Sequence, residues 1–237
     1  MRVLDLPRIP LIEDLTSEAI PAGVQIMVEF DPATPWYNAS LMMAATWIRT
    51  GGSVAYNAFA QSPDDVRAQL KQLGLDARSL ETESKLIIVD WFTVSLGRKP
   101  DRRLAPPSLK LHDITIWFAT NPLPEMSGQQ LIIADNQSVL ARFNDEKLWI
   151  EFHLTHAIPA QRSAKVTAIR GFLRDIHSAW VYRQLESAVD GIVDIKVEDN
   201  GVETADMLRI RSLRNVRFDR NWHRLRSGSN GEVALEK

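Results

Sequence analysis

The chain has 237 residues, a formal net charge of −2 and no cysteine. Its length and its hydrophobic fraction of 45% are sufficient for a substantial buried core. The lack of cysteine excludes disulfides, thiolate metal sites and cysteine nucleophiles, and the slightly negative charge excludes a global basic field that would recruit nucleic acid.

The chain begins with MRVLDLPRIPLIEDL, whose acids and two prolines are not typical of a secretory signal. No apolar run is long enough to cross a bilayer, so we expect no membrane contact and a cytoplasmic protein. Strand patterns are predicted at 24–30, 53–59, 85–92, 129–135 and 164–172. Helical patterns are predicted at 38–49, 62–74, 146–158 and 178–189. Ser62 is expected to cap its helix, Gly74 to follow the end of that helix, and Pro159 to stop the helix before it.

Two further segments have patterns of their own, a loop and a hairpin. Residues 97–110 are basic and rich in proline, which predicts an exposed loop carrying Arg98, Lys99, Arg102 and Arg103. Residues 191–199 and 203–213 flank Asn200-Gly201 and predict a β-hairpin. Alternating strands and helices followed by a hairpin predict an α/β fold with a mostly parallel central sheet, flanking helices and a C-terminal antiparallel hairpin. We expect one domain over residues 1–237.

Five segments are similar, in order and spacing, to the blocks of a known family: AIPAGVQIMVEFDP, SVAYNAFAQSPDDVRAQLKQLGLD, LIIADNQSVLAR, WVYRQLESAVDGIVDIKVED and LRIRSLRNVRFDRNWHRL. Most of the chain thereby resembles the KaiC-like branch of the RecA-superfamily ATPases, especially its single-domain archaeal and bacterial members. The resemblance implies a RecA-like fold. It places the phosphate-binding Walker A loop after the first strand and the Walker B aspartate at Asp135.

The Walker A loop is where the chain departs from the family pattern G-D-P-G-S-G-K-T. Phe30, Ala33 and Pro35 stand for its glycines, Trp36 for its lysine and Tyr37 for its hydroxyl residue, and only Asp31, Pro32 and Thr34 remain similar. A phosphate cradle needs inward-pointing backbone N–H groups and a nearby cation. Pro35 has no N–H and Trp36 carries no charge. The resemblance therefore implies a degenerate phosphate loop, with Trp36 filling the vacated pocket.

A second departure affects the same reaction. The family carries a glutamate pair at the end of its second strand, where one carboxylate positions the attacking water, and Ala60 and Gln61 occupy those places. Asp135 is retained. It either belongs to a magnesium shell or, as an ordinary strand-end aspartate, caps backbone groups. We expect no catalytic residue, no metal and no cofactor.

Other polar groups have structural alternatives. His153 and His156 lie three residues apart near Glu146, which could hold a metal, although packed or capping histidines are expected on so apolar a helix. Ser138, His177 and Asp175 could form a hydrolase triad, but no nucleophile elbow surrounds the serine.

The arginines from Arg209 onward leave three interpretations open. In the first, the segment reaches a neighbouring subunit, as it does in hexameric relatives, through Arg209, Arg211 and Arg214. In the second, these arginines pair with acids such as Asp219. In the third, they contact DNA phosphates weakly. The predicted function is a non-catalytic KaiC-like pseudo-ATPase that regulates or scaffolds through a protein partner, either an active paralogue or a second copy. The alternatives are an ATP-binding KaiC/RadA-like ATPase and a DNA-binding recombinase paralogue.

Overall fold

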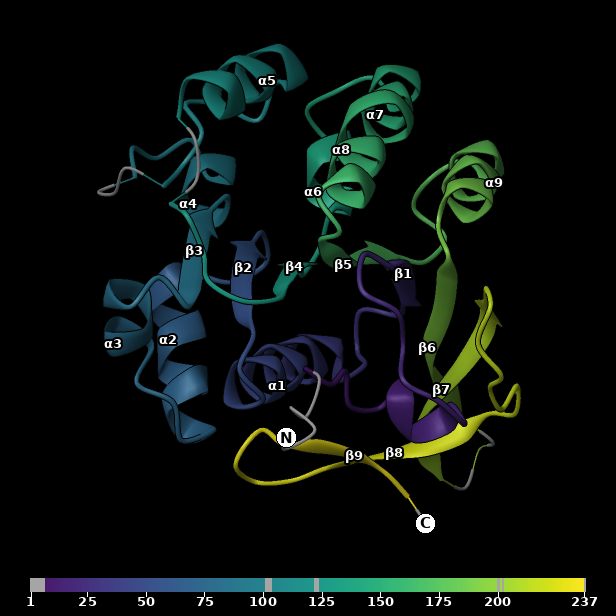
Figure 1. Cartoon of the computed structure of the whole chain (residues 1–237). Coiled ribbons are helices and arrows are strands. Elements are labelled where there is room, and N and C mark those ends of the chain that lie inside the picture. The colour runs from purple at the N-terminus through teal and green to yellow at the C-terminus, as the bar shows by residue number, and fades with distance from the viewer. Residues whose placement is uncertain (1–6, 101–103, 122–123, 200, 202, 237) are drawn as a thin grey trace.

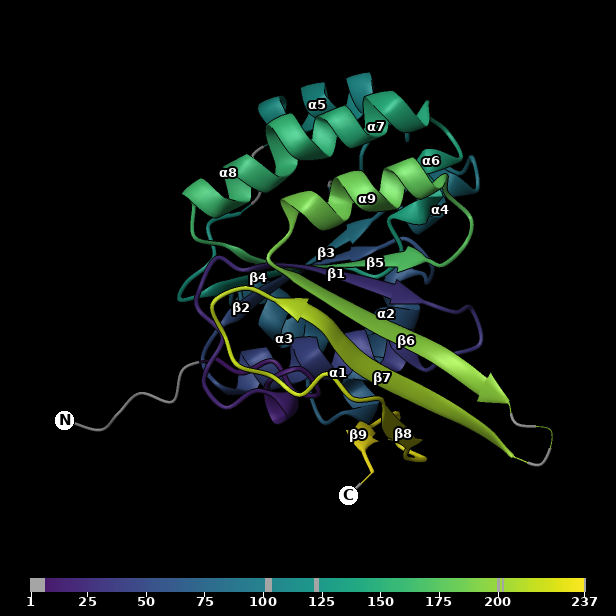
Figure 2. The same ribbon diagram turned by 90° about the vertical axis from the view of Figure 1, so that its right-hand side faces the viewer.

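The computed structural model of the chain describes residues 7–100, 104–121, 124–199, 201 and 203–236. Within these ranges a nine-stranded sheet has the order β3-β2-β4-β5-β1-β6-β7-β8-β9 (Figures 1 and 2). Its strands are β1 Gln25–Phe30, β2 Ser53–Ala58, β3 Leu86–Asp90, β4 Gln130–Ala134, β5 Thr167–Leu173, β6 Gly191–Asp199, β7 Thr204–Leu213, β8 His223–Ser227 and β9 Val233–Leu235.

The strand pairings confirm the predicted fold class. β1 lies between β5 and β6 and is parallel to both, and β2 lies between β3 and β4 and is parallel to both. The pairs β6–β7, β7–β8 and β8–β9 are antiparallel, so the predicted C-terminal hairpin is the first of three antiparallel pairings. Every residue of β1 and β3 is buried, as expected for parallel strands covered on both faces.

Helices cover both faces of the sheet. The helices are α1 Trp36–Arg49, α2 Pro63–Gln72, α3 Ala77–Thr82, α4 Phe92–Ser95, α5 Leu111–Thr120, α6 Ser138–Ala141, α7 Glu146–Phe152, α8 Ile158–Ser163 and α9 Ala179–Ala188. Figure 1 shows α1, α2 and α3 below the sheet and α5, α7, α8 and α9 above it. Each face has its own buried apolar cluster. None of the helices in the described ranges combines the length and the apolar character needed to span a bilayer.

Local signals set several of the helix ends. The Ser62 side chain accepts a hydrogen bond from the Asp65 N–H and caps α2, and Gly74 follows that helix with a positive φ of +80°. The predicted start of the first helix at residue 38 is wrong by two residues. α1 begins at Trp36, directly after Pro35, because proline is favourable at a helix start.

The prediction that Pro159 stops the helix before it is wrong. The chain continues from α7 through a π-helical turn, His153–Ala157, into α8, where Pro159 is among the first residues. Proline lacks an N–H and would clash with a carbonyl in a regular helix interior. The π-helical turn changes the hydrogen-bond spacing just before Pro159, so the missing donor falls at the start of a helical segment.

The described parts of the basic loop, 97–100 and 104–110, contain neither helix nor strand, as predicted, but the predicted exposure is wrong for Ala105, Pro106 and Leu109, which are buried. Three residues for which predictions were made lie outside the described residues: Arg102, Arg103 and Asn200. The helices α3, α4, α5, α6 and α8 and the strands β8 and β9 were not predicted.

Candidate functional site

The loop between β1 and α1 is a short turn held by its own residues and by β6. The Thr34 N–H and Oγ1 both donate to the Asp31 carbonyl, at 3.1 and 2.7 Å. The Asp31 N–H donates to the Ile195 carbonyl at 3.1 Å, and its carboxylate accepts from the Val197 N–H at 3.1 Å. Asp31 and Thr34 are thus engaged in closing this turn, while Pro32 and Ala33 form its exposed tip.

Trp36 is the largest side chain of this region and is fully buried. Its indole Nε1 donates to the backbone carbonyl of Asp135 at 2.6 Å, and its ring centre lies 5.7 Å from that of Phe30. Gly171 on β5 makes this position available. A Cβ built on Gly171 would lie 2.5 Å from the indole nitrogen, so any other residue would displace the ring. The indole therefore bridges the β1–α1 loop, β5 and the end of β4.

Tyr37 is half-buried beside Trp36. Its hydroxyl oxygen accepts from the Asn136 side-chain amide at 3.2 Å, and its ring packs edge-on against Phe30. Burial raises the Tyr37 pKa to about 12, so the hydroxyl stays protonated at neutral pH. The sequence did not indicate Asn136 or Gly171 as neighbours of the loop. A glycine inside a strand is a recognised signal of close approach, and Gly171 is such a case.

Asp135 lies directly after β4 and has no exposed surface. Its Oδ1 accepts from the backbone N–H groups of Phe59 and Ala60, at 2.8 and 3.3 Å. Burial raises the Asp135 pKa to about 7, and these hydrogen bonds offset part of that rise. Asp135, the predicted Walker B position, therefore meets the end of the second strand, and its carboxylate caps backbone groups of the β2–α2 connection. The neighbouring Gln61 side chain accepts from the Gln69 amide.

The arginines of β7 and the turn after it are paired within the chain. Arg209 Nε lies 2.8 Å from an Asp194 oxygen. Arg211 contacts Asp194 at 3.0 Å, Glu186 at 2.6 Å and also Glu29. These acids come from β6, α9 and β1, and Asp219, which the sequence offered as a partner, instead lies 3.1 Å from His223.

Arg214 is less tightly held than the two arginines before it. Its side chain is 52% exposed and lies 3.9 Å from Asp190, while Nη2 donates to the Ser187 carbonyl at 2.9 Å. A role for these arginines toward another subunit stays a prediction.

The other polar candidates have partners inside the fold. His153 is buried, with Nδ1 2.8 Å from the Trp149 carbonyl and Nε2 2.9 Å from the Gln137 amide oxygen. Burial lowers the His153 pKa to about 4, so the ring is neutral. Over the described residues, no group of three or more His, Asp or Glu side chains could hold a metal ion.

Ser138, His177 and an acid do come together, but the acid is Glu146 rather than Asp175. His177 Nε2 lies 2.8 Å from Ser138 Oγ, and Nδ1 lies 3.2 Å from a Glu146 oxygen. Ser138 is only 1% exposed, and its hydroxyl accepts from the Leu173 N–H at 3.0 Å. A buried hydroxyl occupied in this way is suited to joining α6, α7 and the β5–α9 connection rather than to attacking a substrate.

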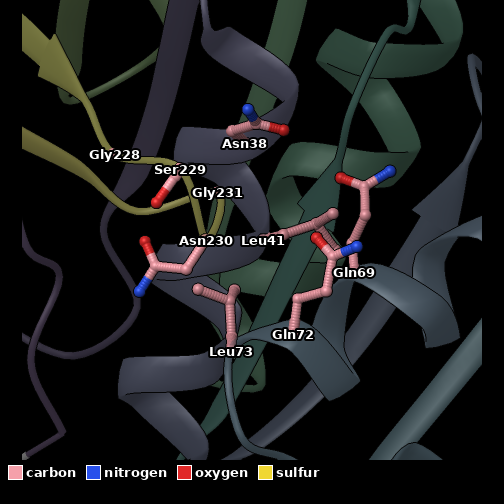
Figure 3. Close-up of a pocket in the computed structure, with 9 residues that line it drawn as sticks. All are labelled: Asn38, Leu41, Gln69, Gln72, Leu73, Gly228, Ser229, Asn230 and Gly231. Carbon is pink, nitrogen blue, oxygen red and sulfur yellow. The ribbon is translucent and has the colours of Figure 1, made fainter.

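A small cavity of about 220 Å³ lies on the α1 face of the sheet (Figure 3). Asn38 and Leu41 from α1, Gln69 and Gln72 from α2, Leu73 and the turn 228–231 line it. Its polar side chains are neutral amides and one hydroxyl. With no acid, base or cation in its lining, this cavity has no group to carry out a reaction.

The fold is similar to that of a solved structure, a KaiC-like protein from the hyperthermophilic archaeon Pyrococcus horikoshii. The TM-score is 0.71, and the match covers 98% of this chain and 97% of that one at 16% sequence identity. No protein-family model and no curated protein matches the sequence. The predicted KaiC-like, RecA-type fold is therefore confirmed.

Proposed function

We propose that this chain is a KaiC-like pseudo-ATPase that regulates or scaffolds through contacts with a protein partner. The observation that carries the proposal is the position of Trp36. Its indole is buried against the end of β4, with Nε1 on the Asp135 carbonyl, and the resemblance assigns this residue to the family's phosphate-loop lysine. A nucleotide phosphate needs a cation and free N–H groups there, and an indole beside Pro35 supplies neither.

The contacts of Asp135 support the same proposal. In an active relative this carboxylate would reach the magnesium shell, but here it accepts hydrogen bonds from Phe59 and Ala60 and has no exposed surface. The positions that would orient the attacking water are Ala60 and Gln61, and neither carries a carboxylate. Binding and hydrolysis thus each lack a necessary group.

Exposed apolar side chains support a role in protein contacts. Leu148 on α7, Ile176 before α9 and Trp180 on α9 are 59%, 53% and 46% exposed. The His177–Glu146 contact joins the same two elements. Large exposed apolar side chains on neighbouring elements are typical of interaction surfaces. We propose that the partner is an active paralogue or a second copy of the chain, and that Arg214 is more available to it than Arg209 or Arg211.

The test is phosphate release by the purified protein with saturating magnesium-ATP. We expect the rate to equal that of buffer alone. Protein-dependent release that disappears in Asp135→Asn would overturn the proposal and favour the ATPase alternative. Sedimentation of the same sample measures self-association.

The recombinase alternative has a different signature. Because Arg209 and Arg211 are neutralised within the chain, we expect only weak DNA binding that falls with salt. A tight complex that survives physiological salt and is lost in Arg211→Ala would favour that alternative.

A further inference from the structure

A cavity of about 330 Å³ lies on the opposite face of the sheet from α1. Its floor comes from β2, β4 and β5, and its walls come from α5 and from the helical segment α7–α8. Figure 1 shows α5 and α8 on this face of the sheet. The volume falls within the range of small-molecule sites. Trp36 and Asp135 do not line it, so it is separate from the loop described above.

Aromatic rings make up much of the cavity wall. Phe59 and Trp91 stack with ring centres 4.9 Å apart, and Phe118 lies 6.2 Å from Trp91. On the opposite side, Phe152 and His156 stack at 5.9 Å. These two stacked pairs border the same space. An apolar body, flat or chain-like, is therefore the chemistry that this lining fits.

The floor of the cavity carries a buried positive charge. Arg170 on β5 is 2% exposed and is the only Arg, Lys, Asp or Glu among the described lining residues. Its Nη2 donates to the side-chain oxygens of Gln25, at 2.8 Å, and Gln161. Its Nη1 is buried and has no hydrogen-bond partner. Among the described residues no carboxylate forms an ion pair with it.

The guanidinium remains charged at neutral pH. Burial and the nearby Arg162 lower the Arg170 pKa to about 10, and the charge of Asp190 offsets part of this change, so the pKa is still well above neutrality. An unpaired buried charge is costly unless a partner of opposite sign satisfies it. The other polar groups around the cavity have partners: Trp91 Nε1 donates to Asn57, and Gln137 contacts His153. Among the described residues that line the cavity, Arg170 is the one with a buried donor, Nη1, that has no hydrogen-bond partner.

We propose that this cavity binds a small apolar monocarboxylate, with its carboxylate on Arg170 and its apolar body between the two aromatic pairs. A planar carboxylate suits the guanidinium fork. A phosphate dianion would need further cations or free N–H groups, and the lining supplies one cation beside the neutral His153. The site does not depend on the state of the nucleotide loop.

The test compares an acid with its neutral amide. Hydrocinnamate and octanoate are titrated into the full chain by calorimetry near neutral pH, with hydrocinnamide as the uncharged counterpart. The proposal predicts that hydrocinnamate binds at least tenfold more tightly than the amide and changes the fluorescence of the chain, since Trp91 lines the cavity. Equal binding of acid and amide, or no binding of either acid at millimolar concentration, would overturn it.

Two variants locate the site. Arg170→Met removes the charge and is expected to abolish the preference for the acid. Ala160→Trp fills the cavity from the exposed side of α8 and is expected to abolish binding of both compounds. Ser163→Trp adds the same ring to an exposed position of α8 outside the cavity and should bind hydrocinnamate as the unaltered chain does. If Arg170→Met does not fold, the Ala160→Trp and Ser163→Trp pair decides, because equal binding by both contradicts the proposed location.

Discussion

At the scale of one residue, substitution of Trp36 tests whether its ring is packed inside the fold beside the β1–α1 loop. Its indole is fully buried and donates to the Asp135 carbonyl, so Trp36→Ala leaves a large cavity and an unpaired carbonyl. We expect the free energy of unfolding to fall by about 3–5 kcal/mol in urea denaturation. Trp180→Ala is the matched control, because Trp180 is 46% exposed. This substitution should change the free energy of unfolding by less than about 1 kcal/mol. Equal effects of the two substitutions would mean that the Trp36 ring is not packed inside.

The raised pKa of Asp135 determines the direction in which the stability of the protein changes with pH. The Asp135 pKa is raised by burial to about 7, whereas an unfolded aspartate titrates near about 3.9. The folded protein therefore holds a proton that the unfolded chain loses, and the stabilisation from this proton disappears as the pH rises through about 7. Asp135→Asn removes the titration while its side-chain oxygen still accepts from Phe59 and Ala60.

The measurement is the free energy of unfolding of both proteins at about pH 5 and about pH 8. The free energy of unfolding of Asp135→Asn minus that of the native protein should rise by roughly 2–3 kcal/mol from the lower to the higher pH. The buried His153, whose pKa is lowered to about 4, has the opposite dependence, but it is common to both proteins and cancels. Parallel pH profiles would contradict the raised Asp135 pKa.

The resemblance to the family indicated part of this candidate site. Proline and tryptophan in place of glycine and lysine indicated the altered loop, and the residues around Asp135 indicated a Walker B position. The contact between them could not be predicted, because Trp36 and Asp135 are 99 residues apart and the contact uses a backbone carbonyl. The space for the ring depends on Gly171 of another strand, which only the folded sheet brings near.

At the scale of elements, replacement of the whole loop separates binding from catalysis. Residues 30–37 would be exchanged for the family's glycine-rich sequence with its lysine and threonine. The N–H cradle and cation would return, but Ala60 and Gln61 still offer no carboxylate for the attacking water. Phe30 and Trp36 are both fully buried, so the exchange should also lower stability by at least about 3 kcal/mol. We expect a lower melting temperature and no phosphate release. Sustained turnover would reveal a catalytic carboxylate elsewhere.

Arg211 holds β7 to its neighbours through three acids. The side chains of Asp194 and Glu29 are 3% and 10% exposed, so removal of Arg211 leaves carboxylates with little solvent. We expect Arg211→Ala to lower the free energy of unfolding by about 3 kcal/mol, toward the lower limit for buried pairs because the arginine is a third exposed. Arg214→Ala, at an exposed arginine, should cost less than about 1 kcal/mol. An unchanged stability together with lost self-association in Arg211→Ala would assign Arg211 to a partner instead.

Elements with strong local signals were predicted from the sequence. Ser62 and Gly74 mark α2, and the apolar runs mark the parallel strands. α5 was not predicted, although Leu111, Ile114 and Trp117 recur every three residues, because it follows a proline-rich segment that obscured the pattern. The prediction wrongly ended the helix before Pro159, because apolar periodicity does not reveal the π-helical turn between α7 and α8.

At the scale of the whole molecule, the fold is KaiC-like, and we propose that the chain's own side chains occupy the phosphate-loop position. The fold as a whole is similar to that of a solved KaiC-like structure, at a TM-score of 0.71. The fold alone does not determine activity, so function must be inferred from the site. The aromatic cavity containing Arg170 lies on the other face of the sheet, which allows the two proposed properties to be tested separately.

The most direct measurement is a calorimetric titration of the purified chain with magnesium-ATP. Because the resemblance places Trp36 at the family's lysine position and Pro35 has no N–H, we predict no heat of binding beyond dilution at millimolar nucleotide. Saturable binding with a micromolar Kd would contradict the closed phosphate loop and the pseudo-ATPase proposal with it.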